Sequence, residues 1–400
     1  MRFAHLGDCH LGSWRQPELQ ELNFRSFQQA VDICIQEKVE FMLLTGDLFD
    51  SAYPPVEILK ETFAEFRKIK EAGIRCFMIA GSHDYSVSGR TFLDVLEKAG
   101  FAEICRHDIS LNENGEIENI SLLPIKYKGF EIYGYPGKKS GLEVQDLKKI
   151  EVPESNNFRI LMLHTSLKEA VGDLPIESIS IEELPKAEYY ALAHLHIDFN
   201  QKKDNSPVIY SGPIFPNSFQ ELEDLGKGSF YVVDVEGYTE PKKKEIKLNE
   251  IVTFSFEIEN ALTATKEIIG EFEKHDLKNK LVLLRLHGII QQGTNADIDY
   301  AKIKEYLEEK EAYSFLKNTH KLSTKKEQES SEIELDVGEM GKIEETLIKE
   351  YELKNPNKFN NQITQLIHSL DLQKQEDEKS VIFESRLFSE LNKILKLEIK

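Results

Sequence analysis

Acidic and histidine residues follow five apolar runs in the chain's first half. Each run is short and rich in β-branched or large apolar residues, which predicts a buried strand, and the polar residues come where that strand should end. An Asp after Gly is most often a turn or helix-cap residue, and a lone His is most often a hydrogen-bonded structural residue. Five such groups in chain order favour a shared chemical site instead. The groups are Asp8-Cys9-His10, Gly46-Asp47, Gly81-Ser82-His83-Asp84, His164 and His194-Leu195-His196.

The spacing within two of these groups indicates a metal site. Side chains two residues apart leave an extended strand on the same face, so Asp8 and His10 can point at one cation while Cys9 points away. The same holds for His194 and His196. Carboxylate with imidazole is a ligand mixture for Mn²⁺, Fe²⁺ or Zn²⁺, whereas Ca²⁺ prefers oxygen alone. Strand ends of α/β sheets are also where such proteins place their sites.

The elements that must position these groups form an α/β pattern from Arg2 to about residue 240. Apolar runs alternate with stretches of helical spacing at 24–38, 56–72 and 91–99. Residues 119–135 and the pair SPVIYSGPI and GSFYVVDVEG indicate consecutive strands, so part of the sheet is expected to be antiparallel or mixed. Two stacked sheets are expected. The expected buried strands are RFAHLGD, EFMLLTGD, IRCFMIAGSHD, FRILMLHTS and YYALAHLH.

A second, smaller α/β domain is predicted at 250–317, after a linker at 237–250 that contains a Pro-Lys-Lys-Lys turn. Its pattern gives strands at 251–259 and 280–289 and helices at 261–274 and 297–310. Residues 318–340 are polar, charged and nearly free of large apolar residues, which predicts a flexible linker.

Three amphipathic patterns occupy residues 341–400, and each places its apolar residues on one helical face. Two interpretations stay open. The helices close on themselves as a small bundle, or they bind a partner, because short tethered helices bury little area alone and gain by docking in a groove. The residues expected at a partner interface are Ile343, Leu347, Phe359, Ile363, Leu366, Ile367, Leu387, Phe388 and Leu391.

Composition limits the class of protein. A chain of 400 residues is expected to form two or three domains. Its 50 basic and 70 acidic residues leave a net charge of −20, which argues against a broad basic nucleic-acid surface but allows a local patch or a metal to hold phosphate. Four scattered cysteines without a CxxC pair indicate a reducing compartment. No apolar run reaches the ~18 residues of a membrane span, and no signal peptide is evident, so we expect a cytoplasmic protein.

The ordered motifs D-x-H, GD, GxHD, H and HxH resemble those of the calcineurin-like metallophosphoesterase superfamily. Their flanks, RFAHLGDCHLG, GDLFDSAYPPVE, ILMLH and YYALAHLH, resemble the Mre-eleven/SbcD family of DNA double-strand-break repair nucleases, particularly archaeal members. The motif match spans about residues 1–230, and the remainder matches in order and size. The resemblance implies a four-layer αββα sandwich of the α/β (α+β) class over 1–240, a small α/β DNA-capping domain and a C-terminal helical tail.

The resemblance also implies roles for the matched residues. His83 would face the scissile phosphate and protonate the leaving oxygen, while Asp84 orients its imidazole. The family reaction is Mn²⁺-dependent hydrolysis of DNA phosphodiesters by two metals, as an exonuclease on duplex ends and an endonuclease on single strands. One metal would be held by Asp8, His10 and His196, the other by His164 and His194, and Asp47 would bridge the two.

Two positions depart from the family pattern. Where the family has GNHD, with its Asn carbonyl on the second metal, this chain has Ser82. A hydroxyl is shorter and a poorer donor, so we expect a second site that is weaker or completed by water; alternatively, Ser82 only shapes the turn. The other departure is Asp50, where members often carry His or Asn. Its carboxylate either repels DNA or contacts a metal-bound histidine from behind.

DNA contacts and partners follow from the same resemblance. Trp14 and Arg15 follow the first ligand motif and Arg90 follows the third, in loops expected to rim the site and contact DNA. The C-terminal helices would bind an ABC-type coiled-coil ATPase of the Rad-fifty/SbcC type. A homodimer is expected through the helices at 56–72 and 91–99, with the protein associated with the nucleoid and not with a membrane.

Two other functions stay open. The first is a scaffold whose second metal site has weakened at Ser82, so that the protein acts mainly by binding DNA and the ATPase. The second is a phosphodiesterase or phosphatase acting on a smaller substrate, although such an enzyme needs neither a cap nor tethered helices.

Overall fold

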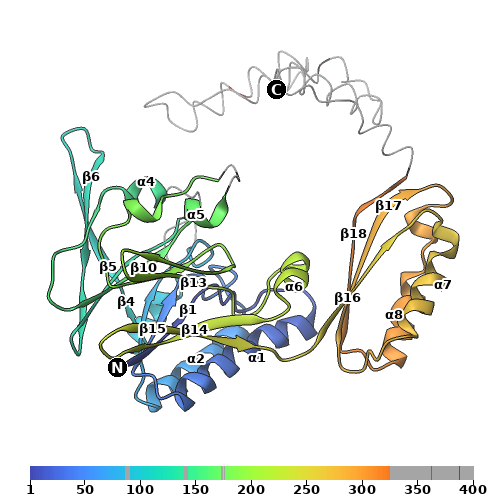
Figure 1. The fold of residues 1–400 in the computed structure, drawn as a ribbon, viewed down its shortest axis with the longest axis horizontal. Helices are drawn as coiled ribbons and strands as arrows, with labels where there is room; N and C mark the ends of the chain where they lie inside the picture. The colour runs from blue at the N-terminus through green and yellow to red at the C-terminus, as the bar shows by residue number, and fades with distance from the viewer. Residues whose placement is uncertain are drawn as a thin grey trace, which may run out of the picture. The chain divides into compact units, whose positions relative to one another are not determined.

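The computed structural model describes residues 1–85, 91–138, 143–172, 174, 176–324, 362 and 387 (Figure 1). Residues Met1–Ser323 form one compact unit. Strands and helices alternate over its first hundred residues, as the apolar patterns predict, whereas consecutive strands follow at 103–135 and 189–211.

The first sheet has six strands in the order β15-β14-β1-β2-β3-β4. β1 to β4 run parallel, β14 pairs antiparallel with β1, and β15 pairs antiparallel with β14. The central strands are apolar along their length because both faces of the sheet are covered. The strands are β1 (Arg2–Leu6), β2 (Phe41–Thr45), β3 (Arg75–Ile79), β4 (Glu103–Ile104), β14 (Gly228–Val235) and β15 (Thr239–Ile246).

The second sheet has six strands in the order β12-β13-β11-β10-β8-β7. Its four inner strands are parallel, and its two edge strands pair antiparallel to their neighbours. Both sheets are therefore mixed, as expected. The strands are β7 (Ile125–Tyr127), β8 (Phe130–Tyr135), β10 (Phe158–His164), β11 (Tyr189–Ala193), β12 (Asp198–Lys203) and β13 (Ser206–Ser211).

Large aromatic side chains fill the space between the two sheets. Phe3 stacks on Phe41 with ring centroids 5.0 Å apart and meets Tyr189 of the other sheet edge-on at 5.1 Å. Burial of such rings stabilises the sandwich by about 1.5–3 kcal/mol for each side chain. This shared core fixes one sheet against the other and so fixes the distance between their strand ends.

Helices cover the outer face of each sheet. Against the first sheet lie α1 (Pro17–Gln36) and α2 (Val56–Glu71) (Figure 1). Together with α3 (Leu93–Lys98), they bury one apolar face in a common core. Against the second lie α4 (Glu143–Leu147), α5 (Lys168–Val171) and η1 (Ile181–Glu183), beside a small sheet of β5 (Arg106–Leu111), β6 (Ile117–Leu123) and β9 (Ile150–Glu151). The result is the four-layer αββα sandwich that the motifs imply.

The smaller domain forms the two strands and two helices predicted for it, and it adds a third strand and a short 3-10 helix. It contains β16 (Ile251–Glu257), α7 (Ala261–Phe272), β17 (Leu281–Ile290), η2 (Asn295–Asp297), α8 (Tyr300–Glu309) and β18 (Ser314–Thr324). Its three-stranded sheet packs on the two α-helices around a core of its own. We call this part the cap.

Two expected boundaries are wrong. The Pro-Lys-Lys-Lys stretch is not a linker turn, because it lies in β15 and extends the first sheet beyond residue 240. β15 is an edge strand, where a proline is tolerated and charged side chains such as lysine are common. The expected linker at 318–340 likewise begins with strand, since β18 continues to Thr324 as an edge of the cap sheet.

The predicted partner-binding helices lie outside the described residues, apart from Leu387, and so does Arg90. Within the described part of the chain, no helix is long and apolar enough to cross a membrane.

Candidate metal centre

The five polar groups meet where β1, β2, β3, β10 and β11 end. Asp8, Asp47 and His164 are almost completely buried, with at most 2% of their surface exposed. The nearness of the groups results from topology, because parallel strands bring their carboxyl ends to one edge and the two sheets are stacked.

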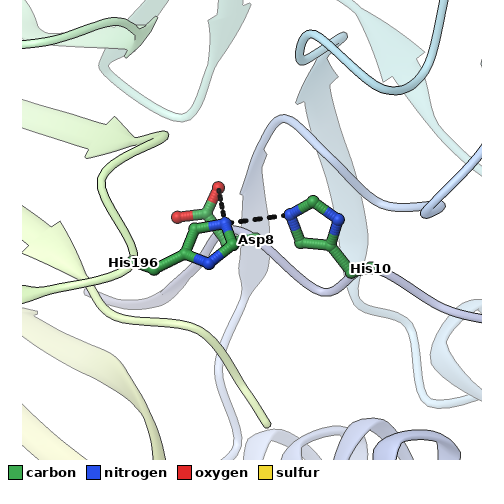
Figure 2. A group of neighbouring side chains, drawn as sticks. All are labelled: Asp8, His10 and His196. Carbon is green, nitrogen blue, oxygen red and sulfur yellow. Dashed lines mark hydrogen bonds and ion pairs between the residues drawn. The ribbon is translucent and has the colours of Figure 1, made fainter. Parts of the chain in front are cut away.

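Asp8, His10 and His196 form the first cluster of ligand atoms (Figure 2). The Nε2 atoms of His10 and His196 are 3.0 Å apart, and His196 Nε2 lies 3.9 Å from Asp8 Oδ1. The three side chains point toward one another, Asp8 and His10 from the loop after β1 and His196 from the loop after β11 (Figure 2). This is the trio predicted to hold the first metal.

Asp8, Asp47 and His164 form an adjoining cluster. His164 Nε2 lies 3.2 Å from Asp47 Oδ2, and His10 Nε2 lies 3.6 Å from the same oxygen. Asp47 therefore lies between a histidine of each predicted metal site. The His194 ring is 4.9 Å from the His164 ring, and the backbone N–H of His194 donates to Asp8.

Five of the predicted ligand residues reach the site through turns, whereas His164 is the last residue of the strand β10. The expectation that Asp8 and His10 share a strand face is wrong, because β1 ends at Leu6. An L-residue adopts positive φ at a cost of about 1 kcal/mol or more, so this conformation requires support from the surrounding structure. The positive φ values are 49° at Asp8, 43° at His10, 51° at Asp47, 111° at His194 and 52° at His196.

Two glycines allow the loops to approach closely. A Cβ atom on Gly81 would lie 2.2 Å from Asp47 Oδ1, and one on Gly46 would lie 2.5 Å from His164 Nδ1. Gly46 also has φ 102°, which disfavours any other residue. Both glycines are needed to hold Asp47 beside His164.

The carboxylates create a negative potential in the buried site. Burial opposes charging of His164 and His196, but Asp47, Asp8 and Glu221 outweigh it and raise the pKa of each imidazole to about 9. Burial and the charge on His164 lower the pKa of His194 to about 4. A site that pulls protons onto some histidines is one that favours a cation.

The donor set fits a divalent metal. Two imidazole nitrogens at 3.0 Å can share only one proton, whereas two lone pairs can converge on one cation. His164 Nε2 is buried without a hydrogen-bond partner, although it faces Asp47. Imidazole with carboxylate suits a transition metal ion such as Mn²⁺, Fe²⁺ or Zn²⁺.

Ser82 and His83 follow β3 and border this centre. The Ser82 hydroxyl donates to Asp47 Oδ2 over 3.3 Å, and the backbone N–H of His83 donates to Asp47 Oδ1 over 2.8 Å. The His83 imidazole is exposed and meets the His10 ring edge-on at 4.7 Å. His83 is thus the exposed imidazole beside the buried ligands.

The predicted role of Asp84 in orienting the His83 imidazole is wrong. Its buried carboxylate accepts instead from the backbone N–H groups of Leu48, Phe49 and Gly81. Burial and the charge on Asp47 raise the pKa of Asp84 to about 7. His83 Nδ1 lies 2.9 Å from the backbone oxygen of Asp50. Asp84 therefore ties together the loops after β2 and β3.

Two carboxylates contact histidines of the first cluster from behind. Asp50 Oδ1 lies 3.2 Å from His10 Nδ1, and Glu221 Oε2 lies 3.2 Å from His196 Nδ1. The Asp50 contact supports the second of the two roles considered for that residue. Glu221 is not among the predicted site residues, because Ser218-x-x-Glu221 has the pattern of a helix N-cap, and Ser218 is indeed the N-cap of α6 (Phe219–Leu225).

The expected DNA-contact residues have mixed surroundings. Trp14 is half-buried, and its indole N–H donates to the carbonyl of Pro216, so its described contacts stabilise the loop. Arg15 is exposed, and the structure does not describe Arg90. Their contacts with DNA remain predictions.

Stacked mixed sheets with histidine and aspartate ligands at their strand ends define a metal-dependent phosphoesterase. The profile of the Calcineurin-like phosphoesterase family matches residues 1–198. The match and the ligand clusters together make the chain a metal-dependent phosphodiesterase with a divalent-metal site.

Curated relatives narrow the class further. The chain is 28% identical over 344 residues to DNA double-strand break repair protein Mre11 of Methanocaldococcus jannaschii, covering 77% of this chain and 89% of that one. Its identity to the protein of the same name from Sulfurisphaera tokodaii is 30% over 294 residues, or 70% of each chain. The chain is also 26% identical over 397 residues to the protein of the same name from Sulfolobus acidocaldarius, covering 95% of this chain and 97% of that one. The chain belongs to the Mre11 family, as the motifs imply.

Proposed function

We propose that this protein is a Mn²⁺-dependent DNA nuclease of double-strand-break repair. It would degrade duplex ends as an exonuclease and cut single strands as an endonuclease. The observation that carries this proposal is the convergence of His10 and His196 beside Asp8 and Asp47, with the exposed His83 at its edge. The names of the relatives, DNA double-strand break repair protein, support DNA as the substrate.

Two Mn²⁺ ions per subunit would bind, one at the cluster of Asp8, His10 and His196 and one at the adjoining cluster around Asp47 and His164. The metals would supply Lewis-acid polarisation of the phosphate and a nucleophilic water at neutral pH. Asp47 would bridge them, since its Oδ2 lies 3.6 Å from His10 Nε2 and 3.2 Å from His164 Nε2. The remaining ligands would be Asp8 and His196 for the first metal, and His164, His194 and the Ser82 hydroxyl for the second.

His83 would move the proton. Its Nδ1 lies 2.9 Å from the Asp50 carbonyl, which can only accept, so the proton on Nδ1 stays there. The exchangeable proton is then on Nε2, and a charged imidazole can pass it to the leaving oxygen of the cleaved strand. The backbone hydrogen bond from His83 to Asp47 holds this acid at a fixed position beside the metal ligands. Asp84 supports the same loop through its backbone contacts.

The proposed substrate and partners are those that the family resemblance implies. DNA ends would be the substrate, with Trp14, Arg15 and Arg90 at the rim, and the helices of 341–400 would bind a Rad-fifty/SbcC-type ATPase. A homodimer would form through α2 and α3, which expose Val56 and Val95.

A second candidate is a DNA-binding scaffold with a weakened second site. Ser82 favours it, because the hydroxyl is engaged by Asp47 and is a weaker metal ligand than an amide carbonyl.

Substrate preference tests the proposed function. Cleavage of an end-labelled duplex and of a small phosphodiester should be measured with Mn²⁺ at equal protein concentration. We expect DNA cleavage that chelation abolishes. Hydrolysis of the small diester without DNA cleavage would instead indicate a smaller natural substrate, and absence of both would favour the scaffold.

A further inference from the structure

The short helix α6 lies between the metal centre and the cap. Ser218 caps its start, and Gly226 ends it in a left-handed conformation with φ 63°. Because residues two apart on a helix point to nearly opposite sides, Glu221 and Glu223 serve different neighbours. Glu221 contacts His196 of the metal centre, and Glu223 binds Arg285 of the cap.

The Glu221 carboxylate is fixed by three donors. The backbone N–H of Asn217 donates to Oε2 over 2.8 Å, the Ser218 hydroxyl donates to Oε1 over 3.1 Å, and His196 Nδ1 lies 3.2 Å from Oε2. A carboxylate held this way places the proton of His196 on Nδ1 and directs its Nε2 toward Asp8 and His10. Asn217 is itself tied to the loop that carries His10, since Ser13 donates to its side chain over 3.1 Å.

On the side of α6 that faces the cap, Arg285 of β17 forms hydrogen bonds with two residues of the helix. Its Nε lies 3.0 and 3.1 Å from the two Glu223 oxygens, its Nη2 also contacts Glu223, and Nη2 donates to Gln220 over 2.9 Å. The guanidinium lies 5.2 Å from the Phe219 ring centre. The paired side chains are only 16% and 13% exposed, so solvent screens this forked pair less than a surface pair.

Apolar packing also joins α6 to the cap. Leu222 is fully buried in a cluster that joins Leu19 and Leu22 of α1 to Leu281 and Leu283 of β17. Displacing the cap would pull on Arg285 and open this cluster. α6 could not keep its position, and with it the Glu221 carboxylate, without those contacts.

We propose that α6 is a strut that couples the cap to the metal centre, with Glu221 as the positioning residue for His196. Metal bound at the cluster of Asp8, His10 and His196 raises the equilibrium constant for docking of the cap. The docked cap raises the affinity for metal by the same factor, since linkage is reciprocal. The strut rests on the metal centre of the proposed function but not on DNA being the substrate. Through it, a ligand that shifts the cap changes the affinity for metal.

Mn²⁺ titration calorimetry on the full chain tests the coupling. Removing a carboxylate behind a metal-bound histidine typically weakens metal binding about 10- to 100-fold, so we expect that loss at the tighter site in Glu221→Ala. Glu221→Gln should lose less, because its amide oxygen still accepts from His196. Glu267→Gln removes the same charge from an exposed position of α7 and should bind as wild type.

The cap side is tested with Arg285→Leu and the milder Glu223→Gln. Allosteric couplings are commonly 5-fold or more, so we expect Arg285→Leu to weaken Mn²⁺ binding by about that factor without touching the metal centre. Its effect should be largely absent when Glu221 is already Ala. Wild-type Mn²⁺ affinity in a folded Arg285→Leu chain would overturn the strut. So would a double variant whose loss of affinity equals the product of the losses in the two single variants. If Arg285→Leu fails to fold, the same measurements on Glu223→Gln decide the question.

Hydrogen exchange gives the reciprocal readout. Saturating Mn²⁺ should slow amide exchange in α6 and in residues 281–290 of wild type, and should not do so in Glu221→Ala. Equal protection in both chains would overturn the strut. A wild-type chain that shows this coupling but does not cleave DNA would refute the proposed substrate and leave the strut standing, because neither readout involves cleavage.

Discussion

His10 and His196 present their Nε2 atoms to each other at 3.0 Å, although 186 residues separate them in the sequence. Each ring is held from behind by a carboxylate, Asp50 for His10 and Glu221 for His196. Two imidazoles oriented this way, beside the buried Asp8, form a preorganised cation site. The rings need not turn when the metal arrives, which favours tight binding.

Metal should stabilise the folded chain. Mn²⁺ at 100 times its dissociation constant should raise the free energy of unfolding by ~2.7 kcal/mol, because only the folded chain brings the ligands together. Thermal unfolding with Mn²⁺ and with chelator measures the shift. His196→Ala should lose most of it, whereas the cap variant His287→Ala should keep it. An equal shift in wild type and His196→Ala would contradict the assigned ligand.

Ser82→Asn should strengthen the second metal site. An amide carbonyl reaches farther than the hydroxyl that now contacts Asp47, and it is a better ligand. Counting bound Mn²⁺ by calorimetry or by electron paramagnetic resonance should show tighter binding of the second ion, with little change in the first. Unchanged affinity and unchanged cleavage would mean that Ser82 only shapes the turn.

His5 should make folding sensitive to acid. It is completely buried between Tyr189 and Thr45, and burial lowers its pKa to about 3. As the pH falls below about 6.5, the unfolded chain takes up a proton that the folded chain refuses, so stability is lost by up to about 2 kcal/mol between pH 7 and 5.

Denaturant unfolding in chelator at several pH values measures this loss. His5→Gln should show a shallower decline of unfolding free energy with falling pH, whatever its stability at pH 7. Both chains keep the metal-site histidines, so the difference isolates His5. An equal decline of unfolding free energy with falling pH in both chains would show that burial of His5 does not cause the acid sensitivity.

The layers of the fold followed from the apolar patterns because buried strands and amphipathic helices have distinct periods. Edge strands carried no such signal: β15 and β18 need one apolar face at most, and their lysines and threonines resemble linker composition. The boundary at 237–250 and the expected start of a linker at 318 are therefore wrong.

The site was predictable as a set of residues but not as a geometry. Asp8 and His10 do converge, yet through left-handed turns that no alternation rule describes. The roles of Asp84 and Glu221 also depend on the geometry of the loops, which the sequence does not show. Asp84 is next to His83 in sequence but binds backbone, while Glu221 reaches His196 only because α6 folds over that loop.

Cleavage of an end-labelled DNA duplex in Mn²⁺ by wild type, Asp47→Asn and His83→Gln tests the central claim most directly, with Asp224→Asn as a matched control. We predict cleavage by wild type and the control. A proton donor contributes about 10²- to 10⁴-fold, so His83→Gln should lose that much while still binding Mn²⁺. Asp47→Asn should lose both cleavage and metal. Equal cleavage by all four chains would contradict the assignment of this centre as the nuclease site.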